Sequence, residues 1–436
     1  MWLVFLAFLI PYDPDEAVYK IVAVDVLEGH WPYDHLFVNR GPLLFLAYLP
    51  AGLTGSIELQ RLVAALAIVA SVPPFFLLAR KWLSGRQVAL AVVSYCVLVA
   101  NPFMIAGANN EAFLLAPLIA AMVVPSAVLA GVLIGAAIML KMTVLPLIPA
   151  ILFLRRKDLR ASVIAALAAC VALTVPFVPV WNDFWTANVT FAFSYADYSA
   201  PERLANTFAI HWGVLLGALP IWLAIVVGGF RERRWALWLL LISGMVAAKS
   251  TGFNATHYYA LITPAAALFA GEGLDRLLRR PRLMAVVLAP ATLVWLSVVV
   301  AGLSILVIGG HRPYSDIVAE LKGRPGELYV LGDHPEIYAY ADRQPQRRYF
   351  FAVPLVFRKD WGSSMRAELL ACPPEFLVLP SITRFRVEWA GDLAAVYRTR
   401  LEFKKATLLT DPKHSCVARD LTNDPRYLKS ISNDFL

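Results

Sequence analysis

The stretch AFLLAPLIAAMVVPSAVLAGVLIGAAIML, residues 112–140, contains no charged residue. As one straight helix it would be about 43 Å long, whereas the hydrocarbon core of a bilayer is about 30 Å thick. The stretch must therefore be divided, and Pro125-Ser126 is the natural place because proline interrupts a helix and serine caps the next one. We predict two short helices joined by a tight turn, both embedded in a membrane.

The rest of the chain supports an integral membrane protein. Of its 436 residues, 59% are hydrophobic and 16% are charged, far from the roughly even split and one-quarter charge of soluble domains. Further runs with little or no charge are residues 62–79, 87–108, 142–154, 161–180, 207–230, 235–248, 258–271 and 283–310. Residues 1–10 are interpreted as the outer half of one more helix. We expect an α-helical polytopic membrane protein with about eleven membrane helices.

The net charge of +8 reports membrane orientation and does not indicate nucleic acid as a partner. The basic residues form four clusters: Arg80/Lys81/Arg86, Arg155/Arg156/Lys157/Arg160, Arg231/Arg233/Arg234 and Arg276/Arg279/Arg280/Arg282. Counting the membrane spans between the clusters places all four on the cytoplasmic side only if residues 41–59 lie at the outer surface and do not cross the membrane. The outer face then carries residues 11–59, 101–111, Lys141, 181–206, 249–257 and everything after 311.

Three outer segments have a recognisable character. Residues 15–28 place Val18, Ile21 and Val22 on one helical face, which predicts an amphipathic helix in the interface. The loop of residues 181–198 is rich in aromatic side chains, as in a belt at the headgroup level. The third outer segment, residues 311–436, is predicted to form a small extracytoplasmic α/β domain. Residues 1–310 form the predicted transmembrane domain. In the α/β domain we expect strands at 327–331 and 376–380 and helices near 335–341 and 364–371.

Asp13, Asp15 and Glu16 place three carboxylates within four residues at the outer boundary. Mutual repulsion and burial should raise at least one pKa and allow that carboxylate to act as a base. The alternative is that these residues only cap an interfacial helix, whose N-terminus favours negative charge. Both interpretations stay open from the residues alone.

Lys141 is the one charge between residues 112 and 154, and an ionisable group at membrane depth suggests function. An ammonium there can hold a phosphate, although a lysine that snorkels from a helix end is the ordinary alternative. Glu111, Arg40 and His257 complete the polar set on the outer face. Each is weak evidence alone.

Metal ligands by residue type occur in GHWPYDH, residues 29–35, where His30, Asp34 and His35 lie close in sequence. Their spacing is not diagnostic, and a surface loop explains them better. We find no nucleophile elbow, phosphate-binding glycine loop or paired CxxC motif in the sequence.

Taken in order, these segments resemble a family of integral membrane glycosyltransferases: the GT-C superfamily, in its bacterial protein O-mannosyltransferase and aminoarabinose-transferase-like branch. The resemblance covers roughly residues 10–310. It rests on YDPDEAVY (12–19), GHWPYD (29–34), NRGPLL (39–44), NE (110–111), LKMT (140–143) and HYY (257–259). Here arginine and glycine replace the lysine and first proline of the family's H-K-P-P-L element, and histidine replaces the arginine of its late R-Y pair.

The resemblance implies an enzyme of the cell envelope that transfers a hexosyl or pentosyl unit, with inversion, from a polyprenyl-phosphate donor. The acceptor would be a hydroxyl of lipid A, another glycan or a protein at the outer face of the bacterial inner membrane. The implied roles are catalysis by Asp15, Asp13 and Glu16, donor-phosphate binding by Lys141, Arg40, His257 and Tyr258, and acceptor orientation by Glu111 and Asn110. A divalent metal, Mg²⁺ or Mn²⁺, is a further expectation, with Asp13 and Asp15 as its ligands.

Two other classes of membrane protein compete with this interpretation. A transporter or lipid flippase is also polytopic, but it tends to show repeated halves and broken helices near the midplane, which this sequence lacks. A structural or assembly protein with an exported α/β domain predicts no function for the acidic cluster. Alanine substitutions of Asp13, Asp15 and Lys141 separate these alternatives.

Overall fold

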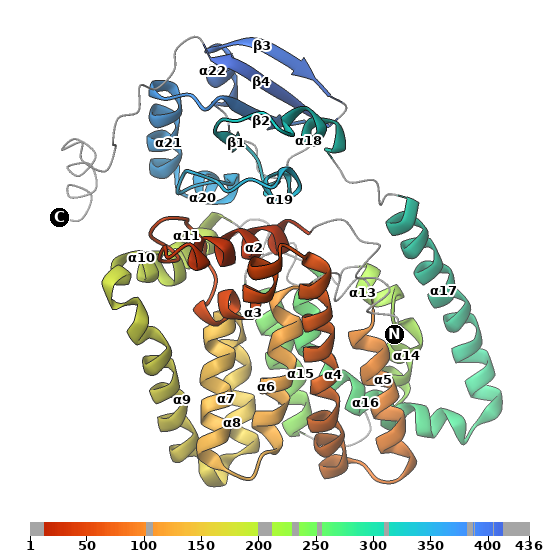
Figure 1. The fold of residues 1–436 in the computed structure, drawn as a ribbon. Helices are drawn as coiled ribbons and strands as arrows, with labels where there is room; N and C mark the ends of the chain where they lie inside the picture. Colours follow the sequence, from red (N-terminus) through yellow and green to blue (C-terminus); the bar gives the residue numbers. More distant parts are fainter. Residues whose placement is uncertain are drawn as a thin grey trace. The chain divides into compact units, whose positions relative to one another are not determined.

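The computed structural model describes residues 13–101, 108–198, 212–228, 235–250, 255–308, 314–381, 387, 389–403 and 405–412. Contacts divide the chain into two units, Met1–Ser315 and Asp316–Leu436, and each is described by itself (Figure 1). The predicted half-helix at residues 1–10 and the predicted domain boundary after residue 310 lie outside the described residues.

The first unit is helical. Its α-helices are α2 (Pro14–Leu27), α3 (Pro42–Thr54), α4 (Ile57–Trp82), α5 (Arg86–Val99), α6 (Asn110–Val123), α7 (Ala127–Leu140), α8 (Ile148–Leu154), α9 (Leu159–Thr174), α10 (Trp181–Trp185), α11 (Phe191–Tyr198), α13 (Trp212–Leu216), α14 (Leu219–Gly228), α15 (Trp235–Lys249), α16 (Thr263–Leu278) and α17 (Pro281–Ile308). Short 3₁₀ or π segments are η1 (Met142–Leu147), η2 (Arg156–Asp158), η3 (Val175–Val180), η4 (Thr186–Thr190) and η5 (Thr256–Ile262).

Several of these helices have the length and composition of membrane spans. Among the described residues, three helical stretches are long and apolar enough to cross: Ile57–Trp82, Arg156–Ser194 and Pro281–Ala301. Shorter apolar helices of 10–17 residues are Pro42–Thr54, Arg86–Val99, Asn110–Val123, Ala127–Leu140, Met142–Leu154 and Trp235–Lys249.

The long apolar stretch is divided where the sequence predicts. Helix α6 ends at Val123 and α7 begins at Ala127, with the Ser126 hydroxyl accepting the Leu129 N–H at 3.2 Å as its N-cap. Helix α7 then packs very closely against α9. A Cβ atom at Gly131 would lie 2.3 Å from the Ser162 carbonyl oxygen, so only glycine permits this approach.

Helix α3 occupies part of the segment predicted not to cross the membrane. It has 13 residues and is therefore about 20 Å long, similar to the 14 residues of α6 and of α7, so its length does not test that prediction. It ends at Gly55, whose φ of 69° is left-handed, and Ser56 caps α4 immediately afterwards.

Helix α2 differs from the predicted amphipathic interfacial helix. Residues 16–23 are buried without interruption, so the helix is covered on nearly every side and not on one face alone. The reason is tertiary: α3 packs against α2, and Arg61 of α4 reaches Glu16. The helix is part of the protein interior.

The aromatic segment of residues 181–198 is also helical, formed by α10, η4 and α11, and is not the loop we expected. Its inner rings pack within the protein, since Phe184 stacks on Phe177 with ring centroids 5.6 Å apart. Trp185 and Phe193 are 50% and 69% exposed, which suits the outer part of an interfacial belt.

Helices α4 and α6 connect two ends of the unit. At one end Arg61 of α4 and the Ala108 N–H both bind Glu16 of α2. At the other end Lys81 donates to the Met122 carbonyl at 3.0 Å, and Arg155 donates to the Val124 carbonyl at 2.6 Å. These two basic clusters therefore lie together, at the opposite end of the helices from α2 (Figure 1). The cluster at 231–234 lies outside the described residues.

The second unit is a small α/β domain. Its elements are α18 (Ser315–Leu321), β1 (Leu328–Val330), α19 (Glu336–Ala341), α20 (Ala352–Phe357), α21 (Lys359–Ala371), β2 (Phe376–Pro380), α22 (Ala390–Ala394), β3 (Tyr397–Glu402) and β4 (Ala406–Pro412). The sheet order is β1-β2-β4-β3, with β1 and β2 parallel and the other pairs antiparallel. Leu369 of α21 packs with Leu377 and Leu409 in the core.

The sequence anticipated β1, β2, α19 and α21 but not β3 or β4. Strand β3 is an edge strand with mostly exposed side chains, including Arg398 and Arg400, so it lacks the apolar run by which β2 is recognised. Strand β4 is buried between β2 and β3.

Candidate active site

The site begins at the N-terminus of α2, where Asp13 is the N-cap. Its side-chain oxygen accepts the Asp15 N–H at 2.9 Å, and Glu16 accepts the Asp13 N–H at 3.1 Å, which completes a capping box. Pro14 fits the first helical position because its missing N–H has no partner there. The capping role weighed from the sequence is therefore real for Asp13 and Glu16, and it leaves the side chain of Asp15 free of that role.

Glu16 is fully buried and engaged on both oxygens. Arg61 donates from Nε at 2.8 Å and from Nη2 at 2.5 Å, and the Ala108 N–H donates at 2.6 Å. Such a bidentate pair holds α2, α4 and the segment before α6 together. Its contacts point to a structural role, and the prediction that Glu16 takes part in catalysis stays a prediction.

Asp15 faces Arg40, which lies just before α3. The Arg40 Nη2 atom is 3.2 Å from Asp15 Oδ1, while its Nε donates to the Tyr19 hydroxyl at 2.9 Å. The Asp15 side chain remains 32% exposed, so it is accessible to a ligand.

Gly41 explains one departure from the family's motif. A Cβ atom at this position would lie 2.0 Å from the Met139 carbonyl oxygen. The backbone next to Arg40 therefore touches the end of α7, two residues before Lys141. Neither proline nor any other side chain fits there without a shift of the backbone.

Glu111 and Lys141 form a second, more deeply buried pair. The Lys141 Nζ atom is 2.5 Å from Glu111 Oε1 and 3.9 Å from the centre of the Tyr258 ring. The Lys141 and Glu111 side chains are only 8% and 1% exposed. Lys141 caps the C-terminus of α7, a position that favours a cation.

Several buried polar atoms around this pair have no hydrogen-bond partner within the part of the chain that the structure describes. They are Oε2 of Glu111, Oδ1 and Nδ2 of Asn110, and Oγ1 of Thr143. Buried polar groups are rarely left in this state, because the loss of hydration is costly. The arrangement suits a polar ligand that supplies the missing hydrogen bonds.

Electrostatics joins these parts into one site. Burial raises the pKa of Asp15, but the charges of Arg40, His257 and Lys141 outweigh it and hold that pKa below its usual range. Lys141 and His257 also interact electrostatically with the Glu111 carboxylate. Burial lowers the pKa of His257, against the raising effect of the Glu111 and Asp15 carboxylates.

Asp13 behaves differently from Asp15. Burial raises the pKa of Asp13, and repulsion from Asp15 and Glu16 raises it further. The expectation that one member of the acidic cluster has an elevated pKa therefore fits Asp13. One Asp13 oxygen is bonded to a backbone N–H and Asp15 Oδ1 faces Arg40, so the predicted metal ion at Asp13 and Asp15 would share both carboxylates with these partners.

The predicted residues thus come from five separate segments: the start of α2, the residues before α3, the start of α6, the end of α7, and η5. Sequence reasoning missed Tyr19, which orients Arg40, and Tyr48, whose hydroxyl donates to the Ala108 carbonyl at 2.6 Å. It also missed Arg61. The signal for Arg61 was present, since an arginine next to a long apolar run requires a partner for its charge.

No protein-family model matches the chain, and no curated protein matches it. Solved structures do. ArnT from Cupriavidus metallidurans bound to undecaprenyl phosphate superposes with a TM-score of 0.62 and 16% identity, over 94% of this chain and 95% of that chain. The chain has the fold of ArnT. The apo state of the same ArnT gives a TM-score of 0.58 and 15% identity, over 93% of this chain and 95% of that chain.

The ArnT fold confirms the fold class predicted from the sequence: a helical polytopic membrane protein followed by a small α/β domain. The likeness spans nearly the whole of both chains. The resemblance first drawn from six short motifs is confirmed at the level of the fold.

Proposed function

We propose that the protein is a membrane glycosyltransferase that uses a polyprenyl-phosphate-linked sugar as its donor. The observation that carries the proposal is the convergence of Asp15, Arg40, Glu111, Lys141 and His257 from separate segments of an ArnT fold. One carboxylate is accessible, and the cations beside it suit a phosphate. ArnT itself has been crystallised with undecaprenyl phosphate, which supports this class of donor.

Asp15 is the proposed catalytic base. The acceptor hydroxyl oxygen attacks the anomeric carbon, its proton passes to Asp15, and the bond between that carbon and the phosphate oxygen breaks. The leaving phosphate takes the electron pair, and attack from the opposite face inverts the configuration. The lowered pKa keeps the accessible Asp15 carboxylate deprotonated at neutral pH but makes it a weak base. The proton therefore passes to Asp15 late, when the new bond to the anomeric carbon has made the acceptor hydroxyl strongly acidic.

Arg40 and Lys141 are the proposed phosphate ligands. Negative charge increases on the phosphate as the glycosidic bond breaks, and fixed cations stabilise that charge in the transition state. Arg40 is held by Tyr19, and Lys141 by Glu111 and the Tyr258 ring, so both are positioned in advance. A ring nitrogen of His257 can donate a hydrogen bond in the same place.

Asn110 and Glu111 are the proposed acceptor-binding residues, because their free polar atoms can orient a hydroxyl. Asp13 supports Asp15 by capping the same helix turn. The steps above use protein side chains alone, and the metal ion expected at Asp13 and Asp15 stays a prediction.

We also propose that the site faces the outer side of the bacterial inner membrane, with an envelope hydroxyl on lipid A, a glycan or a protein as acceptor. The basic clusters at residues 80–86 and 155–160 lie at the opposite end of the helices, which supports a cytoplasmic position for that end. A donor anchored in the membrane suits such a site, since nucleotide sugars are cytoplasmic.

The test is transfer of a radiolabelled sugar from a polyprenyl-phosphate donor by the purified protein. We expect Asp15→Asn to reduce kcat/KM by about 10²-fold or more, the usual effect of removing a catalytic base. Asp34→Asn, an exposed aspartate of the same outer region, is the matched control and should retain transfer. Right-side-out and inverted vesicles report which face is active.

Wild-type transfer by Asp15→Asn would show that another residue is the base. Donor binding without any product from the wild-type protein would favour the transporter or flippase.

A further inference from the structure

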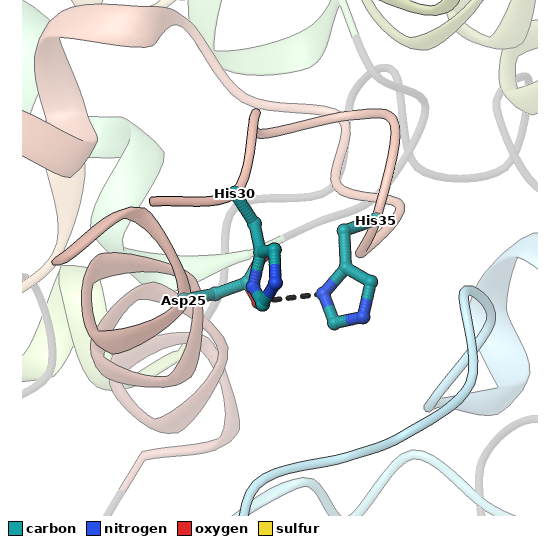
Figure 2. Close-up of side chains that lie close together, drawn as sticks. All are labelled: Asp25, His30 and His35. Atoms are coloured by element: carbon teal, nitrogen blue, oxygen red, sulfur yellow. Dashed lines mark hydrogen bonds and ion pairs between the residues drawn. The ribbon is translucent and has the colours of Figure 1, made fainter. Parts of the chain in front are cut away.

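Three metal-ligand side chains meet at the C-terminal end of α2. Asp25 lies in the last turn of the helix, and His30 and His35 lie in the loop that follows it (Figure 2). The Nδ1 atoms of His30 and His35 are 2.9 Å and 2.6 Å from the same oxygen, Oδ1 of Asp25. Within the described ranges, this is the one group of three histidine, cysteine or acidic side chains close enough to share an ion.

The other oxygen of Asp25 gives a second, independent observation. Oδ2 is buried and has no hydrogen-bond partner among the described residues, and the side chain as a whole is 3% exposed. A buried carboxylate oxygen without a partner is costly. Hydrogen bonds from the two imidazoles explain Oδ1 but leave Oδ2 unexplained, whereas a bound cation can engage both oxygens.

The loop is held in the shape that brings the two histidines together. Tyr33 has a φ of 79°, a left-handed conformation that is unfavourable for a side chain of this size. It is fully buried, and its hydroxyl donates to the Arg40 carbonyl at 2.8 Å. Phe184 lies against its ring at a centroid distance of 5.4 Å. The cluster is therefore built by a fixed loop.

We propose that Asp25, His30 and His35 form a binding site for a divalent transition-metal ion of the Zn²⁺ type. Two imidazole nitrogens and a carboxylate oxygen suit Zn²⁺, whereas Mg²⁺ and Ca²⁺ prefer oxygen ligands alone. The histidines are 45% and 39% exposed, so ions can enter and water can take the fourth position. The sequence suggested Asp34 beside the two histidines, but Asp34 is exposed and the fold supplies Asp25 instead.

The ligand atoms are close to the required geometry. Tetrahedral coordination with bonds of about 2.0 Å separates ligand atoms by about 3.3 Å, slightly more than the present 2.6 Å and 2.9 Å. Small rotations of the two rings provide that space. The bound ion would fix residues 25–35, which lead directly to Arg40, and would act there as a structural ion. The site lies about 15 Å along α2 from Asp15, so it is separate from the proposed chemistry.

The test is direct metal binding by the full-length protein, purified in detergent without an oligohistidine tag and stripped with a chelator. Calorimetric titration with ZnCl₂ should show one ion per chain with a Kd below about 10 µM. Co²⁺ should give the visible absorption bands of tetrahedral coordination. Asp25→Asn and His35→Gln should each weaken binding about tenfold or more. Asp34→Asn and His257→Gln are matched controls that should bind as the wild type does.

A wild-type Kd weaker than about 10 µM overturns the proposal. Wild-type affinity in folded Asp25→Asn and His35→Gln proteins overturns it as well. His35 is partly exposed, so His35→Gln gives a folded variant even if Asp25→Asn does not. Thermal unfolding provides a second readout, since Zn²⁺ should raise the Tm of the wild type and of the controls only.

Discussion

The two ends of helix α2 both present aspartates to the loop that follows the helix, but the partners differ in kind. At the N-terminal end Asp15 faces Arg40, with the charges of Lys141 and His257 near it. At the C-terminal end Asp25 faces two imidazoles, His30 and His35. Guanidinium and ammonium groups are permanent cations that suit a phosphate, whereas imidazole nitrogens can bind a metal ion. One helix therefore organises an anion site and a cation site.

The N-terminal end also shows that neighbouring acids can differ in role. Glu16 uses both oxygens in a buried bidentate pair with Arg61, while Asp15 keeps an accessible carboxylate. We assign stability to the first and chemistry to the second. The following predictions test these assignments and the contrast between the two ends of α2.

The largest effect on stability is expected for Glu16→Gln, which removes the carboxylate charge that Nε and Nη2 of Arg61 both bind. Breaking a buried ion pair in this way costs about 3 kcal/mol or more. Thermal unfolding in detergent measures the loss. Arg279→Gln, an exposed arginine paired with Asp275, is the control and should cost less than about 1 kcal/mol. Normal stability of Glu16→Gln with complete loss of transfer would instead make Glu16 catalytic.

The largest effect on transfer beyond Asp15 itself is expected for Lys141→Gln. Loss of one fixed cation at the leaving phosphate should reduce kcat by about 10²-fold to 10³-fold. The remaining Glu111 carboxylate would be buried without its cation, so a double variant with Glu111→Gln restores charge balance. Lys81→Gln, at the other end of the helices, is the matched control. Full activity of Lys141→Gln would reduce this lysine to a structural partner of Glu111.

A moderate effect is expected on the pH profile of Arg40→Gln. Arg40 contributes most to lowering the pKa of Asp15 below its ordinary value of 3.8. Removal of the Arg40 charge therefore raises the pKa of Asp15. Because a base works only when it is deprotonated, the acid limb of kcat/KM then moves to higher pH. Arg86→Gln, which breaks the pair with Asp275, should leave the limb in place.

The wild-type limb itself distinguishes the two aspartates. If the acid limb of kcat/KM lies below about pH 4, the catalytic base is Asp15. If it lies at clearly higher pH, the base is Asp13, because burial raises the pKa of Asp13.

The smallest effect on transfer is expected for Asp25→Asn. If the two ends of α2 are separate sites, this variant loses metal binding but keeps most of its activity when assayed at 25 °C. Asp15→Asn should show the reverse pattern, with metal binding retained and transfer lost. Loss of both properties in either variant would join the two ends into one functional unit.

The amino-acid sequence by itself determined the membrane class, because long runs without charge leave few alternatives to buried helices. It also determined the break at Pro125-Ser126 and the strand at Phe376–Pro380, where local chemistry is decisive. It supplied the polar candidates Asp15, Arg40, Glu111 and Lys141, since charges in an apolar chain stand out.

The tertiary structure alone decided which of these groups meet and what each one does. The burial of α2 on nearly every side, the pairing of Glu16 with Arg61 and the meeting of Asp25 with His30 and His35 all depend on contacts between separate elements. Local sequence carries no information on such contacts, because residues many positions apart become neighbours only when helices pack. For the same reason, two adjacent acids at the start of α2 came to have different partners.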